Sequence, residues 1–162
     1  MDIVTETFDL FEDHVPHGHE AFMVLQAHLL LEMRLRAFVK ARITDDELLK
    51  EIFNRNSPVN GGKGLIIFSK SIASRDDIQL AACDISWKGV DMLNNLRNDL
   101  AHDLNPNSES IVQKMKNFIE AMNEEVPSSN QLNAVFRICA FKLITAISLH
   151  LKPAIPSDFD VI

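Results

Sequence analysis

The chain has 162 residues, of which 46% are hydrophobic and 24% are charged, so it can bury a real core and is too apolar to be disordered. Its formal net charge of −7 argues against a protein that coats nucleic acid, because non-specific binding depends on Lys and Arg neutralising phosphates. Five Gly and six Pro leave little material for the turns of an all-β fold. We therefore expect one all-α domain over residues 1–162, a single helical bundle of long antiparallel core helices with additional short helices.

The cellular setting is predicted from features near the N-terminus and from the cysteines. The first residues are acidic and lack the basic and apolar regions of a signal peptide, and no uninterrupted apolar run reaches the roughly 18 residues of a membrane span. Cys83 and Cys139 stand apart, without the CxxC spacing of a zinc site or a disulfide framework. We expect a cytoplasmic protein that does not contact a membrane.

The first half of the chain is predicted to hold one long helix and several short ones. Residues 1–18 form an N-terminal arm, with residues 2–11 either a short helix or loosely docked. Residues 19–43 contain neither Gly nor Pro and are apolar on most faces, which predicts a helix in a core or an interface. Thr44 and Glu47 have the spacing of a capping box, with Thr44 as N-cap of a short helix ending near residue 54.

The middle of the chain is harder to assign from sequence. Residues 56–62 have loop composition, and the apolar run 65–68 is read as one or two buried helical turns rather than a strand. A further short helix is expected from Ser74 to about residue 82.

The second half is predicted to contain three helices. The first, over residues 84–104, has a core stripe opposite a polar face, and its members are Gly89, Val90, Leu93, Leu96, Leu100 and Leu104. The next begins at Ser108 or Ser110, and the last long helix covers about residues 130–151. Residues 153–162, which start with a proline, are expected to form a flexible tail.

The polar face of the 84–104 helix has an unusual composition. Asn94, Asn95 and Asn98 lie there with His102, and Trp87 is expected beside them. Because Asn is a poor helix former, a solvated face built from Glu and Lys would cost less. A polar cleft or a polar subunit interface explains this face better.

Arg97 and His102 are the candidate catalytic residues of this helix. Five positions apart, they differ by roughly 140° around the helix and about 7–8 Å along it, so both side chains lie toward one side. A fixed cation close to a group that titrates near neutral pH suits chemistry on a phosphodiester. A surface arginine beside a histidine at a helix end is the simpler alternative.

The run from Leu96 to His102 resembles the Arg-x(4–6)-His motif of the HEPN superfamily. The helix around Glu32 resembles the helix of that superfamily that carries an acidic residue. The resemblance covers roughly residues 19–104 and implies two antiparallel helices in a bundle of four or five. The chain also bears a looser resemblance to mannitol-repressor-like regulators.

Active HEPN proteins are ribonucleases that need no metal and act as dimers, with Arg and His of both subunits lining one cleft. Applied to this chain, the resemblance implies that Arg97 stabilises the phosphate, that His102 transfers a proton, and that Asn98 orients the cleft. Asn94 would support the site, and Glu32 would pair with Arg97 or fix the histidine tautomer. The resemblance implies a homodimer acting on RNA, with an antitoxin or another protein as a possible partner and no cofactor.

A non-catalytic regulatory or protein-interaction module is the alternative implied by the same resemblance. Many HEPN proteins are such modules, the chain is acidic, and Asp99 beside the cleft would repel RNA phosphates. No basic recognition helix of a DNA-binding motif is recognisable. The histidines at 14, 17 and 19 lie among acidic residues, but their loop setting makes a metal site the less favoured interpretation.

Overall fold

The computed structural model describes residues 2–18, 20–73, 85–102 and 108–151, and its regular structure is helical throughout those ranges. The fold is all-α, as the composition predicted. In chain order the elements are α1 (Ile3–His14), α2 (Glu20–Arg42), α3 (Asp46–Ile52), α4 (Gly62–Ala73), α5 (Trp87–His102), α6 (Glu109–Ala121), the 3-10 turn η1 (Ser129–Gln131) and α7 (Leu132–Leu149).

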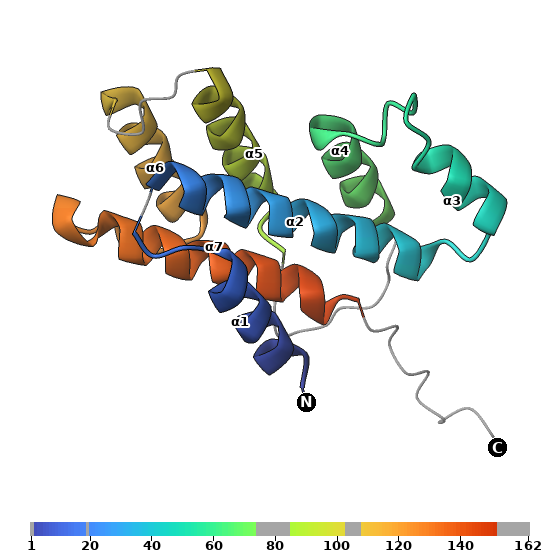
Figure 1. Cartoon of the computed structure of the whole chain (residues 1–162), viewed down its shortest axis with the longest axis horizontal. Coiled ribbons are helices and arrows are strands. Elements are labelled where there is room, and N and C mark those ends of the chain that lie inside the picture. Colours follow the sequence, from blue (N-terminus) through green and yellow to red (C-terminus); the bar gives the residue numbers. More distant parts are fainter. Residues whose placement is uncertain (1, 19, 74–84, 103–107, 152–162) are drawn as a thin grey trace.

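The two longest helices, α2 and α7, lie side by side and run in the same direction, which differs from the antiparallel arrangement expected of the long core helices (Figure 1). Asn133 at the start of α7 donates to the Glu20 carboxylate at 2.7 Å, and Arg42 at the end of α2 donates to the His150 carbonyl at 3.0 Å. Around this pair, α1 and α6 pack against α7, while α4 and α5 pack against α2. The α2 helix is therefore buried on one broad side, as its apolar composition predicted.

Polar side chains at the helix starts explain where several helices begin. Asp2 accepts hydrogen bonds from the Val4 and Thr5 amides at the start of α1, and Ser108 accepts one from Ile111 at the start of α6. Of the two serines considered for α6, Ser108 is therefore the cap. The N-terminal arm contains a regular helix, α1, and this helix packs on α7.

Two details differ from the sequence predictions. The N-cap of α3 is Asp45, whose carboxylate accepts from the Glu47 and Leu48 amides, and not Thr44. The α5 helix begins at Trp87 rather than 84, because Ser86 stands just before it and its hydroxyl accepts from the Gly89 amide. The predicted helix over 74–82 and the tail over 153–162 lie outside the described residues.

Helix α4 confirms the interpretation of residues 65–68 as helical and extends it to Gly62–Ala73. Leu65 and Ile66 are buried against the core, whereas Phe68 is partly buried and Ile67 is 58% exposed, so the run is helical but only part of it is buried. A Cβ atom at Gly64 would lie 1.8 Å from the Pro58 carbonyl oxygen, which only glycine allows. The preceding loop is thereby held against the first turn of α4.

Candidate functional site

The α5 helix places the predicted site residues at different depths. Arg97 and His102 are exposed, and Asn98 is partly buried. The Arg97 guanidinium donates to the Asn98 side-chain oxygen at 3.0 Å, so Asn98 orients the arginine within its own helix. His102 is the last residue of α5, and its side chain makes no hydrogen bond to another described residue.

Asn94 is buried within the subunit, which corrects its placement on the polar face of α5 opposite the core stripe. It is 5% exposed, and His28 of α2, at 6% exposure, faces it across the helix interface. The Nε2 atom of His28 lies 3.1 Å from Oδ1 of Asn94. Since the amide oxygen only accepts, this nitrogen carries the proton, and the pair joins α2 to α5 one turn before Arg97.

Burial lowers the pKa of His28, because the charged imidazolium loses its hydration in the interior. The hydrogen bond to Asn94 and the nearby Glu32 carboxylate act in the opposite direction and raise this pKa, whereas the Arg97 cation lowers it. His28 is accordingly neutral near neutral pH.

Glu32 pairs within α2 and not with Arg97. Its carboxylate accepts from Nη2 of Arg36 at 2.8 Å, an i,i+4 ion pair. Arg36 also donates to the side chain and to the backbone carbonyl of Asn60, both at 2.7 Å. The predicted pairing of Glu32 with Arg97 is thus wrong, and Arg36 instead binds the loop before α4.

The first turn of α4 lies against the same pair of buried residues. A Cβ at Gly62 would lie 3.4 Å from Oδ1 of Asn94, so α4 begins directly beside the polar contact between α2 and α5. Lys63 next to it is exposed. Three helices therefore meet at Asn94.

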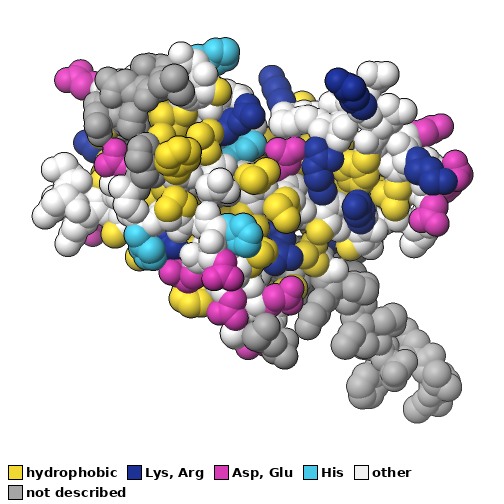
Figure 2. Space-filling model, in the orientation of Figure 1, with side chains coloured by type: hydrophobic (Ala, Val, Ile, Leu, Met, Phe, Trp, Pro, Cys, Tyr) yellow, Lys and Arg dark blue, Asp and Glu magenta, His cyan; other side chains and the backbone are white. Residues whose placement is uncertain are grey.

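The negative charge of Asp99 is balanced by an ion pair that the sequence did not reveal. It is ion-paired with Lys114 of α6 and is only partly exposed. Figure 2 shows Lys and Arg side chains over α2 and toward α4, with Asp and Glu side chains gathered around α1. The acidic net charge is thus unevenly distributed over the surface.

Trp87 does not belong to the polar face. Its ring packs edge-on against Phe38 of α2, with centroids 6.4 Å apart, and it borders the hydrophobic core. The tryptophan therefore covers the edge of the hydrophobic core at the start of α5.

The sequence analysis assigned no role to His28. A signal was present: His28 is four residues before Glu32, so both lie near one side of α2. In the part of the chain that the structure describes, no three His, Cys, Asp or Glu residues group as metal ligands would. His17 instead contacts Glu12 at 3.1 Å.

One described segment, Ser129–Leu149, is long and apolar enough to cross a membrane by composition alone. More than half of it is buried in the bundle, as expected of a central core helix. Comparison with protein-family models, curated proteins and solved structures gives no match for this chain.

Proposed function

We propose that this protein is a cytoplasmic, metal-independent endoribonuclease that acts as a homodimer, with Arg97 and His102 as its catalytic residues. The observation that carries the proposal is that both side chains are exposed on one helix, outside any ion pair among the described residues. A positioned cation and an imidazole in reach of solvent are what a phosphodiester reaction needs. A toxin-like role with a cognate antitoxin fits the same resemblance.

RNA carries its own nucleophile, so the proposed reaction needs no metal ion. The ribose 2′-oxygen forms a bond to phosphorus while the bond from phosphorus to the 5′-oxygen breaks, leaving a 2′,3′-cyclic phosphate and a 5′-hydroxyl. A proton leaves the 2′-hydroxyl and another reaches the 5′-oxygen; His102 of one subunit or the other would carry each. Arg97 would stabilise the negative charge that develops on the phosphate oxygens.

The surroundings of Arg97 support this assignment. Asn98 holds the guanidinium, and the buried contact between His28 and Asn94 fixes α5 against α2 one turn earlier. The ion pair with Lys114 offsets the charge of Asp99, which weakens one of the two electrostatic objections to an RNA substrate; the acidic net charge is the other. The exposed Lys63 adds positive charge from the first turn of α4, whereas the charge of Arg36 is already paired with Glu32.

Single-stranded RNA incubated with the purified protein in EDTA tests the proposal. We expect cleavage, with His102→Ala and Arg97→Ala each lowering the rate at least about a hundredfold. His14→Ala and Arg55→Ala are matched controls, because both residues are exposed on other elements and should leave the rate unchanged. Cleavage that requires a divalent metal, or that persists in His102→Ala, would exclude the mechanism.

A non-catalytic regulatory or interaction module, of the mannitol-repressor-like kind, is the second candidate. It is favoured by a half-exposed apolar stripe on α2, formed by Phe22, Leu29 and Met33. In that case the protein would cleave no RNA under any condition, and the stripe would still bind a protein surface.

A further inference from the structure

A second site lies between α1 and α7, away from Arg97. It is a pocket of about 280 Å³ with three phenylalanines in its wall, Phe8, Phe11 and Phe141, and with Ile138 at its mouth. The rings of Phe8 and Phe11 both pack edge-on against Phe141, with centroids 5.7 and 5.6 Å apart. The pocket is thus lined mainly by aromatic rings and has room for one apolar side chain.

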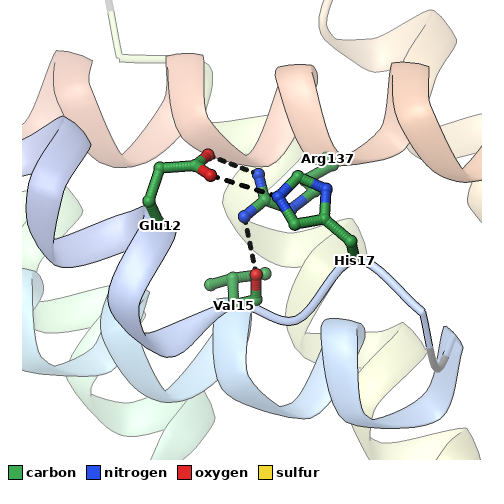
Figure 3. A network of polar contacts seen from close by, with 4 residues as sticks. All are labelled: Glu12, Val15, His17 and Arg137. Carbon is green, nitrogen blue, oxygen red and sulfur yellow. Dashed lines mark hydrogen bonds and ion pairs between the residues drawn. The ribbon is translucent and has the colours of Figure 1, made fainter.

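A polar network holds the wall of this pocket in place (Figure 3). Arg137 of α7, which is buried, donates to the Glu12 carboxylate and to the Val15 carbonyl, both at 2.6 Å. Its guanidinium also lies 4.8 Å from the centre of the Phe11 ring. Glu12 in turn accepts from His17. Because these contacts join α1 to α7, the pocket is preformed and does not depend on an occupant.

The surface around the pocket is apolar at its centre. Phe8 is 49% exposed and Ile138 is 53% exposed, although both are large apolar side chains. Val4, one turn before Phe8, is also exposed. Such a patch at a concave site is typical of a protein-binding surface.

The rim of the same surface is acidic. Helix α1 and its cap carry the carboxylates of Asp2, Glu6, Asp9, Glu12 and Asp13. Asp9 adjoins Phe8 in sequence. Glu12 lies one turn beyond Phe8 on the pocket side, but it is paired with Arg137 and His17, so the other α1 carboxylates supply the negative charge of the rim. On the α7 side the exposed cation, Lys142, is already paired with Glu124. Figure 2 shows Asp and Glu side chains gathered around α1.

We propose that this surface binds a basic amphipathic helix of a partner protein. An aromatic or branched aliphatic side chain of that helix would fill the pocket beside Phe8 and Ile138, and its Lys and Arg residues would face the α1 carboxylates. The choice of partner follows from charge complementarity, since an apolar centre with an acidic rim disfavours acidic partners and nucleic acid. The site is separate from Arg97, so this inference stands or falls independently of the ribonuclease proposal.

Binding of a labelled peptide tests the inference on the full chain. The probe is an amphipathic peptide of about 18 residues made of Leu and Lys with one Phe, and its matched control carries Glu in place of Lys. At about 50 mM salt we expect the Lys peptide to bind at least about tenfold tighter than the Glu peptide by fluorescence anisotropy, with weaker binding as salt is raised.

Surface variants locate the binding and complete the test. Ile138→Ser, and Asp9→Lys combined with Asp13→Lys, should each weaken binding of the Lys peptide at least about fivefold. Ile67→Ser and Glu51→Lys are matched controls, because they change an equally exposed apolar side chain on α4 and a carboxylate on α3. Absence of binding, equal binding of both peptides, or insensitivity to Ile138→Ser would overturn the inference. A dimer that dissociates on Ile138→Ser would assign the surface to a second copy instead, and would also overturn it.

Discussion

At the scale of single residues, His28 should make the stability of the protein depend on pH. Its pKa is lowered by burial in the folded state, so between its folded and unfolded pKa values the unfolded chain binds the extra proton. The free energy of unfolding should therefore fall as the pH is lowered through the ordinary histidine range. His28→Gln keeps a donor for Asn94 but cannot titrate, so its unfolding free energy should fall less between pH 7.5 and pH 5.0.

Urea unfolding of both proteins at the two pH values measures this difference. Carboxylates titrate in both proteins and therefore cancel in the comparison. An identical loss of stability in wild type and His28→Gln would show that His28 already takes up its proton in the folded protein, against the burial seen here. His28→Ala is the contrasting variant, because it leaves the buried Asn94 oxygen unpaired and should cost about 1–3 kcal/mol at pH 7.5.

The site residues differ in how far sequence alone could place them. Arg97 and His102 were placed on one helix by helical spacing, and the structure has both on α5. The burial of Asn94 could not be predicted, because it depends on where α2 and α4 pack against α5. Helical periodicity within one segment carries no information about that packing. The ion pair of Glu32 with Arg36 was visible as an i,i+4 spacing, but the resemblance favoured a partner on another helix.

At the scale of secondary-structure elements, the start of α4 depends on a glycine. Gly64→Ala would add helix propensity worth about 1 kcal/mol, but its Cβ would meet the Pro58 carbonyl oxygen at 1.8 Å, and backbone cannot yield as a flexible side chain can. We expect Gly64→Ala to lower the free energy of unfolding by about 1–3 kcal/mol. Gly61→Ala is the matched control, since nothing lies within 4 Å of the position its Cβ would take and its effect should stay within about 0.5 kcal/mol. A Gly64→Ala protein as stable as wild type would show that the loop before α4 can move away.

Among the elements, long helices were predicted better than short ones. Residues 19–43 were expected to be helical and α2 covers Glu20–Arg42, because a long uninterrupted segment without Gly or Pro has few alternatives. The cap of α3 was misplaced by one residue, since Thr44 and Asp45 are both good N-caps and only the backbone decides between them. Trp87 was misplaced because its neighbour Phe38 lies on another helix, far away in sequence.

At the scale of the whole molecule, the proposed ribonuclease requires a second copy, and the exposed stripe on α2 offers a surface for it. Leu29 and Met33 are 51% and 52% exposed and lie one turn apart, next to Glu32 and Arg36 and on the helix that carries His28. A two-fold contact through this stripe would bring the α2 and α5 faces of two subunits together, so that Arg97 and His102 of both copies could share one cleft. Two negative charges introduced into this stripe should prevent the two-fold contact.

We therefore expect wild type to sediment as a dimer and the double variant Leu29→Glu with Met33→Glu to sediment as a monomer of unchanged helicity. RNA cleavage should be lost in that variant together with the dimer, whereas Arg97→Ala should remain dimeric while losing activity. Ile67→Glu and Leu48→Glu are the matched controls, because these side chains are comparably exposed on α4 and α3 and should leave the dimer intact. A monomeric wild type that cleaves RNA would reject the shared cleft, and a dimer that survives both charges would place the interface on another surface. Since buried carboxylates at an interface cost several kcal/mol, an interface through this stripe could not tolerate two of them in each subunit.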